Sequence, residues 1–188
     1  MYYYEYYDSP VGRLTISSND NSIVGLWFEH QRFYMDVLQG KECGQKDTEV
    51  IWLAKKWLDR YFLGEKPAIG ELSIQFIGSD FRVAVWQMLT EIPYGAVITY
   101  GELAKRIARK RGLKAMSAQS VGGAVGHNPI SILVPCHRVV GANGNFIGYS
   151  SGVGTKMKLL ELEGVDVNNY YLPVKGTVLK ICEKELLC

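Results

Sequence analysis

Apolar and polar residues alternate between positions 11 and 28, on both sides of the polar segment SSNDNS at positions 17–22. This period of two, interrupted by a polar turn, predicts a β-hairpin. The segment from Leu72 to Phe76 also alternates and predicts a further strand. A small sheet is therefore expected to open the fold.

A helical period follows the hairpin. Apolar residues recur at helical spacing between Val50 and Phe62, Asp47 and Thr48 offer capping side chains, and Gly64 follows as a stop. We expect this helix to pack on the sheet. Its Trp and Tyr side chains are interpreted as core residues and not as a binding surface.

From Ser79 onward the pattern is mainly helical. An amphipathic helix is predicted over residues 81–89 and ends at the turn IPYG, residues 92–95. Thr99 and Glu102 then form a T-x-x-E capping box, which is typical of the start of a helix. That helix is expected to continue through LAKRIARKR.

A second short helix, AQSVGGAVG at residues 118–126, is predicted after the cap Ser117 and before Asn128 and Pro129. The two helices and their brief connection predict a helix-turn-helix element. The glycines of the second helix lower its helix propensity by about 1 kcal/mol each. They favour close approach either to a nucleic-acid backbone or to a neighbouring helix, and the pattern does not choose between these.

The charge of the chain is unevenly distributed. The 188 residues are 47% apolar, enough for a folded core, and the net charge is only +2. Residues 1–78 hold 8 basic and 11 acidic side chains, whereas residues 79–165 hold 10 and 5. Six of these cations lie close together in the predicted helix-turn-helix: Lys105, Arg106, Arg109, Lys110, Arg111 and Lys114. They indicate either phosphate binding or a solvated helix face.

The cysteines and histidines are scattered, without a CxxC pair. We therefore expect no metal site, no disulfide framework and no cofactor. The amino terminus lacks the features of a leader, and no segment approaches the roughly 20 apolar residues of a membrane span. The protein is expected to be a monomer without membrane contact, cytoplasmic, or nuclear if its source has a nucleus.

Cys136 and His137 stand side by side after the apolar run ISILV. A cysteine acts as a nucleophile in its thiolate form and needs a base, but neighbouring side chains on a strand point to opposite faces. Pro135 makes a turn plausible. A carboxylate could orient the histidine, and Glu161 and Glu163 at the end of a predicted helix over residues 155–163 are both candidates. A buried, inert thiol remains the alternative.

The segment NPISILVPCHRVVGANGNFIGYSSG, followed by KLLELEG, resembles the carboxy-terminal signature of the O6-alkylguanine-DNA alkyltransferases, the methylated-DNA-protein-cysteine methyltransferases. The resemblance is without gaps from about Val121 to Gly164. It extends more loosely to IPYGAVITYGELA, DFRVAVWQML, SPVGRLTIS and GLWFE, and thus covers most of residues 9–165.

The resemblance implies an α/β amino-terminal domain, a ribonuclease-H-like small sheet plus helix, over residues 1–78. A mainly α domain with a winged-helix-like or helix-turn-helix DNA-binding element follows over residues 79–165. The family flips O6-alkylguanine out of double-stranded DNA and transfers the alkyl group, once only, to a cysteine. Carried over to this chain, Cys136 is the acceptor, His137 the base acting through water, and Glu163 the residue that orients it. O4-methylthymine is expected as a second substrate.

The resemblance also implies roles for residues around the thiol. Tyr100 donates a proton to the base and crowds the target phosphate, and Asn128 braces the turn at the thiol. The residues expected to form the base pocket are Val139, Tyr149 and Ser150. Those expected to contact DNA are Tyr100, Gly101, Gln119, Ser120, Gly122, Gly123, Arg138 and Ala142.

Two other functions are alternatives to this interpretation. Alkyltransferase-like proteins bind the lesion without accepting the alkyl group, but their motif replaces the cysteine that this chain has at Cys136. A Cys-His hydrolase would need an oxyanion hole and would turn over many times.

The sequence departs from the family pattern at one important position. The family places R-A-V-G-G in the recognition helix, where this chain has Gln119, Ser120, Val121, Gly122 and Gly123. Glutamine lacks the charge and the planar stacking face of the guanidinium, so base flipping is expected to be less well supported. The connection RKRGLKAMS is longer and more basic than expected, and its cations could offset this deficit. Residues 166–188 lie beyond the resemblance and have no predicted role.

Overall fold

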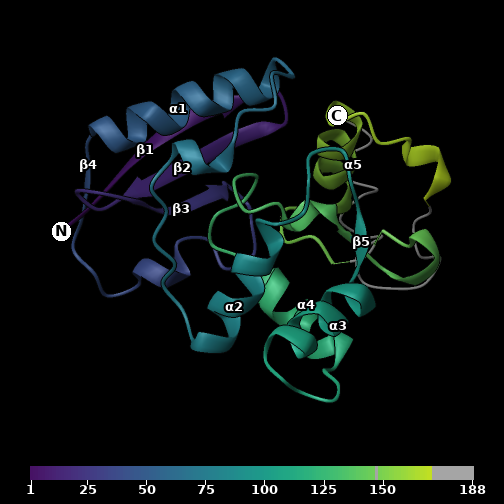
Figure 1. Cartoon of the computed structure of the whole chain (residues 1–188). Coiled ribbons are helices and arrows are strands. Elements are labelled where there is room, and N and C mark those ends of the chain that lie inside the picture. Colours follow the sequence, from purple (N-terminus) through teal and green to yellow (C-terminus); the bar gives the residue numbers. More distant parts are fainter. Residues whose placement is uncertain (147, 171–188) are drawn as a thin grey trace.

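The computed structural model describes residues 1–146 and 148–170 (Figure 1). The chain opens with a four-stranded sheet in the order β3-β2-β1-β4. The strands are β1 (Tyr2–Ser9), β2 (Gly12–Ser18), β3 (Ile23–Phe28) and β4 (Cys43–Gln45). The pairs β1–β2 and β2–β3 are antiparallel, and β4 runs parallel to β1. The predicted hairpin is confirmed as β2–β3, whereas β1 and β4 were not predicted.

The helix α1 (Glu49–Phe62) lies along one face of this sheet (Figure 1). The hydroxyl of Thr48 accepts a hydrogen bond from the Ile51 amide at 3.3 Å, which caps the helix as predicted. Its apolar stripe is buried, including Trp57 and Tyr61. The prediction of an amphipathic helix packed on the sheet is therefore confirmed.

The strand predicted from Leu72 to Phe76 is wrong. A single β-bridge joins Ile74 to Ile23, after a short 3-10 helix η2 (Ile69–Glu71). The free edge of β3 explains this, because two separate segments share it. Ile23 bonds Ser73 and Gln75, whereas Leu26 bonds the segment at residues 129–131. Each segment forms one isolated β-bridge with β3, so neither is a regular strand.

The remainder of the described chain is mainly helical. It contains α2 (Asp80–Leu89), α3 (Tyr100–Lys110), α4 (Ala118–Gly126) and α5 (Val153–Leu162), and a two-stranded parallel sheet of β5 (Ile98–Thr99) and β6 (Val139–Val140). Short 3-10 helices are η1 (Asp36–Leu38), η3 (Cys136–Arg138), η4 (Ala142–Gly144) and η5 (Val167–Asn169). The predicted caps of α3 and α4, Thr99 and Ser117, accept the expected amide hydrogen bonds. The helix α5 begins two residues before its predicted start.

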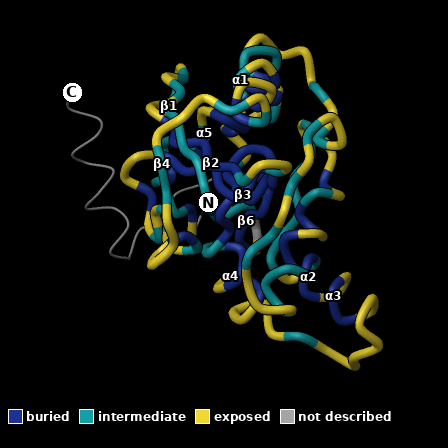
Figure 2. The backbone as a smooth tube through the Cα atoms, turned by 90° about the vertical axis from the view of Figure 1, so that its left-hand side faces the viewer, coloured by how far each residue is buried: buried dark blue, intermediate teal, exposed yellow. Residues whose placement is uncertain are grey.

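The two parts share one hydrophobic core. A single buried cluster contains Leu14 and Tyr61 from the sheet and helix part together with Trp86 and Val134 from the helical part. Figure 2 shows the buried segments gathered in the interior, with the exposed ones on the connections and the outer helix faces. No helix among the described residues is long and apolar enough to cross a membrane. The fold thus joins a mixed sheet and its helix to a mainly helical part.

Residues 166–170 pack on the body of the protein. Val167 is buried, and the ring of Tyr170 stacks on Phe146 with centroids 4.8 Å apart. The remaining part of the tail, residues 171–188, lies outside the described residues.

Candidate active site and nucleic-acid interface

Cys136 begins the turn η3 directly after Pro135. The side chain is 4% exposed, and that of His137 is 0% exposed. Because the two residues lie in a turn and not on a strand, their side chains need not point to opposite faces. Within the described residues, the nitrogens of His137 make no direct hydrogen bond to the thiol, since Nε2 faces Glu163 and Nδ1 has no protein partner.

Asn128 holds the turn and the thiol together. Its Nδ2 donates to the Cys136 Sγ at 3.1 Å and to the Val134 carbonyl at 2.8 Å, while its Oδ1 accepts from the Ile130 amide at 3.0 Å. The intervening Ile132 has a φ of 68°, a left-handed conformation that is rare for a β-branched residue. Such strain persists where the surrounding structure enforces it, and here Asn128 spans the turn on both sides.

Glu163 is the centre of a buried hydrogen-bond network at the end of α5. Its Oε1 accepts from His137 Nε2 at 2.7 Å, from Tyr61 Oη at 2.8 Å and from Arg138 Nη2 at 2.8 Å. Its Oε2 accepts from Arg138 Nε at 2.8 Å and from the Gly95 amide at 3.1 Å. Glu161, the other candidate, is exposed. The carboxylate against His137 is therefore that of Glu163.

Gly95 is suited to this network because it carries no side chain. Its φ is +73°, and a Cβ there would lie 2.9 Å from the Glu163 carbonyl oxygen. Any other residue would strain the turn and push this backbone away from Glu163.

The network sets the charges of its members. Burial opposes ionisation of Glu163, but the hydrogen bonds from His137 and Arg138 outweigh it and hold the pKa of Glu163 well below its usual range. Burial lowers the pKa of His137, although Glu163 partly opposes this. We therefore assign a neutral imidazole that donates from Nε2 to the carboxylate. Its Nδ1 is then free to accept a proton.

The thiol itself is in an apolar setting. Burial raises the pKa of Cys136, and the hydrogen bond from Asn128 and the charge of Lys156 partly offset this. Lys156 is fully buried on α5, where it donates to the Val139 carbonyl, and burial lowers its pKa to about 8. A thiolate at Cys136 thus requires a proton acceptor close by, because desolvation disfavours it.

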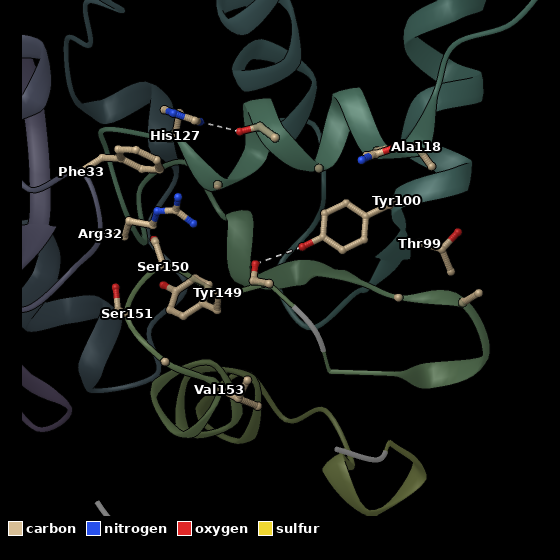
Figure 3. A pocket seen from close by; sticks show the side chains of 18 of the residues that line it. Arg32, Phe33, Thr99, Tyr100, Ala118, His127, Tyr149, Ser150, Ser151 and Val153 are labelled. Carbon is tan, nitrogen blue, oxygen red and sulfur yellow. Dashed lines mark hydrogen bonds between the residues drawn. The ribbon is translucent and has the colours of Figure 1, made fainter. Parts of the chain in front are cut away.

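A cavity of about 980 Å³ opens between α3, α4 and the loop at residues 148–153 (Figure 3). Among the predicted site residues, those that line it are Tyr100, Gly101, Gln119, Gly122, Gly123, Ala142, Tyr149 and Ser150. The Tyr100 hydroxyl donates to the Gly148 carbonyl at 3.1 Å. Cys136 and Val139 do not line the cavity, and both are buried. Ser120 is exposed on α4.

The glycines of α4 form one wall of this cavity. A Cβ added at Gly123 or Gly126 would meet nothing within 4 Å, and at Gly122 it would make only ordinary contact with Tyr100 at 3.7 Å. Packing against a neighbouring helix therefore does not require these glycines. They leave backbone accessible from the cavity, which suits close approach of another molecule.

Arg138, which the resemblance assigned to DNA contact, lies mostly inside the protein. The residue is 9% exposed, and its guanidinium binds both oxygens of Glu163 and the Ile92 carbonyl. Each of its three nitrogens donates to an acceptor inside the protein, and these bonds hold the side chain inward. The turn η3 directs this side chain inward, toward Glu163.

Several neighbours of the site were not expected from the sequence. The loop after β3 contributes His30, Arg32 and Phe33 to the lining of the cavity. The ring of Phe33 stacks on His127 with centroids 3.8 Å apart (Figure 3). Tyr61 was assigned to the core, which is correct, but its hydroxyl also contacts Glu163. The loop after β3 has no periodic pattern of apolar residues that would predict its position. Which group the Tyr61 hydroxyl contacts depends on tertiary packing.

Two family descriptions together match most of the chain. Residues 2–76 match "6-O-methylguanine DNA methyltransferase, ribonuclease-like domain", and residues 80–165 match "6-O-methylguanine DNA methyltransferase, DNA binding domain". The chain belongs to the 6-O-methylguanine DNA methyltransferase family.

Individual relatives agree with this placement. The chain is 40% identical over 163 residues to the methylated-DNA–protein-cysteine methyltransferase of Haemophilus influenzae, with 87% of each chain covered. It is 36% identical to that of Methanosarcina acetivorans, covering 86% of this chain and 98% of the relative. The crystal structure of Mycobacterium tuberculosis OGT in complex with DNA superimposes with a TM-score of 0.74 at 35% identity, covering 89% of this chain and 98% of that one.

Proposed function

We propose that this protein removes the alkyl group from O6-methylguanine, and from O4-methylthymine, by a single transfer to Cys136. Membership of the family makes it a methylated-DNA–protein-cysteine methyltransferase acting in DNA repair. The observation that carries the residue assignment is the buried thiol, held by Asn128 and followed in the same turn by a histidine that donates to a carboxylate.

Proton transfer precedes or accompanies the attack. His137 Nδ1 accepts the thiol proton through a water molecule. Its Nε2–H keeps the hydrogen bond to the Glu163 carboxylate throughout. The negative carboxylate stabilises the imidazolium that forms. Burial makes this relay necessary, since it raises the pKa of the Cys136 thiol.

The transfer step breaks one bond and forms one. The Cys136 Sγ attacks the methyl carbon, the bond from that carbon to O6 breaks, and its electron pair passes to the purine. The purine takes up one proton, donated by Tyr100 and replaced from the imidazolium. The net result is S-methylcysteine and guanine. A thioether is a poor leaving group, so no second turnover follows.

The cavity supplies the place for the damaged base. An atom inside a stacked base pair cannot reach a buried thiol, so the nucleotide must leave the duplex, which costs a few kcal/mol. Tyr149 and Ser150 line the cavity and form walls of the proposed base pocket. Val139 is also proposed to contact the base, although it is fully buried in this structure and does not line the cavity.

The DNA surface in this proposal is the helix-turn-helix of α3 and α4. Tyr100, Gly101, Gln119, Ser120, Gly122, Gly123 and Ala142 are its proposed contacts. Of the six clustered cations, Arg106 and Lys110 pair with Glu102 and Glu91. Within the described part of the chain the other four form no ion pair, which leaves them available to phosphates. We also propose two domains, residues 1–78 and 79–165, with the boundary before α2.

The test uses the intact protein and a duplex oligonucleotide that carries one O6-methylguanine. Mass spectrometry of the protein and of its peptides is expected to find one added methyl group, located on the Cys136 peptide, and no more than one transfer per protein molecule. An unmodified Cys136 peptide, or repeated turnover, would contradict the proposal. The second outcome would favour a hydrolytic mechanism.

Replacing Gln119 with arginine is expected to increase the transfer rate. Gln119 is exposed on α4 and lines the cavity, so a side chain there can enter the space left by the extruded base. Arginine adds a charge and a planar stacking surface, and we expect about a threefold to tenfold gain in affinity for the lesion duplex. Binding and single-turnover transfer are measured at two salt concentrations. Gln119→Lys, which adds charge without the planar group, is the control.

If Gln119→Arg left both affinity and rate unchanged, the proposed deficit at this position would be wrong. A comparable gain in Gln119→Lys would assign the effect to charge alone.

A further inference from the structure

Tyr61 links the ribonuclease-like part of the chain to the proposed catalytic relay. It lies on α1, and its hydroxyl donates to Glu163 Oε1 at 2.8 Å across 102 positions of sequence. The same oxygen accepts the hydrogen bond from His137 Nε2. A side chain outside the DNA-binding part therefore contacts the carboxylate that orients the proposed base.

The phenol has little freedom to move away from this carboxylate. Tyr61 is 1% exposed, and its ring stacks on Trp57 with centroids 5.5 Å apart and planes 10° from parallel. The rings of Phe62 and Tyr94 pack edge-on against it. The aromatic contacts thus fix the direction in which the hydroxyl points.

The hydroxyl also acts only as a donor toward Glu163. Burial raises the pKa of Tyr61 well above its usual value, and the charge of Glu163 raises it further. The phenol is therefore protonated at neutral pH. Its hydrogen bond reaches a charged acceptor in a water-poor setting, where such bonds are stronger than between neutral groups.

We propose that Tyr61 is a positioning residue of the alkyl-transfer relay, holding the Glu163 carboxylate in the orientation that His137 requires. The inference rests on the proposed function. It assigns to the ribonuclease-like part a direct contribution to the chemistry, in addition to its share of the common core. Arg138 also binds both oxygens of this carboxylate, so removing the Tyr61 hydroxyl loosens the group without freeing it.

Tyr61→Phe is expected to slow methyl transfer about threefold to tenfold, less than the full effect of losing one hydrogen bond to a charged group, because Arg138 still holds the carboxylate. The ring packing is retained, so the fold should persist. The titration midpoint of His137 is expected to move to higher pH. The reason is electrostatic: loss of a donor leaves more negative charge on Oε1 to stabilise the imidazolium.

The charged and titratable groups around His137 all remain in this variant. Glu163 and Lys156 face it from α5, and Cys136 and Arg138 belong to its own turn. The midpoint is measured by NMR of the imidazole signals. The chain has three histidines, so His30→Gln and His127→Gln variants assign the signals by elimination.

Tyr7→Phe is the matched control. The Tyr7 hydroxyl donates to the Asp59 carboxylate on the same helix α1, at 3.0 Å and away from the relay. This variant loses the same kind of bond and should change neither the transfer rate nor the His137 midpoint. Wild-type rate and midpoint in Tyr61→Phe, or equal changes in Tyr7→Phe, would overturn the inference.

The NMR measurement separates this inference from the proposed function. It needs no DNA and no transfer. A midpoint shift confined to Tyr61→Phe supports the positioning role even if the wild-type protein failed to methylate Cys136, a failure that would overturn the function alone.

Discussion

Replacing Cys136 with serine is expected to abolish methyl transfer while leaving the fold and the affinity for lesion DNA unchanged. A hydroxyl is far less acidic than a thiol and is a weak nucleophile without strong activation. The proposed His137 relay is matched to a thiol, so the rate should fall at least about a thousandfold. Cys136 does not line the cavity, so the DNA-binding surface stays intact.

The measurement follows the added methyl by peptide mass spectrometry and DNA binding by titration with the lesion duplex. Cys43→Ser is the matched control. Cys43 is a free, partly buried cysteine in β4, outside the cavity and the relay, and its replacement should leave transfer at the wild-type level. A methyl group acquired by the Cys136→Ser protein would refute the assignment of the acceptor.

Glu163→Gln is expected to reduce transfer about a hundredfold and to destabilise the protein by about 3–5 kcal/mol. The amide has nearly the shape of the carboxylate but no charge. It cannot stabilise the imidazolium of His137. The guanidinium of Arg138, 9% exposed, is left without its counter-ion. Transfer is measured in single-turnover experiments, and stability by urea unfolding.

Two further variants separate chemistry from stability. Glu161→Gln makes the same change two residues earlier on α5, where the side chain is exposed, and should alter stability by less than about 0.5 kcal/mol and leave the rate unchanged. The double variant Glu163→Gln/Arg138→Met removes the unpaired cation and should recover part of the stability but not the rate. Full recovery of transfer in the double variant would show that Glu163 acts only through folding.

The charge of Glu163 also gives this network a pH dependence. Its pKa in the folded protein lies below the unfolded value of about 4.3, so folding favours the ionised form. The stabilisation is complete above that value and is lost as the pH falls below it. Acid unfolding of the wild-type protein should include this contribution, and unfolding of Glu163→Gln should lack it.

Much of the fold could be predicted from short stretches of sequence. Thr48, Thr99 and Ser117 cap the helices that their positions predicted, and the alternation at residues 11–28 corresponds to β2 and β3. The strand β1 escaped because its run of tyrosines has no apolar–polar alternation. The segment 72–76 alternates like a strand, but pairs only once because the β3 edge is shared.

The proposed site, too, could be predicted only in part from the sequence. The resemblance brought Cys136, His137 and Glu163 together, although the helical pattern alone left Glu161 and Glu163 equivalent. The structure distinguishes them, since one is exposed and the other receives five hydrogen bonds. The inward direction of Arg138 could not be predicted, because a cation at this position has the same sequence pattern whether its side chain faces solvent or the core.

The sequence by itself determined the helices, their caps, the hairpin and the family to which the chemistry belongs. These features depend on periodicity, capping and motifs, whose partners lie within a few residues or at a fixed spacing along the chain. Only the tertiary structure decided that Arg138 turns inward, that the glycines of α4 face a cavity, and that Tyr61 reaches Glu163. Those contacts join side chains up to 102 positions apart, and they exist because one hydrophobic core packs both parts of the chain together.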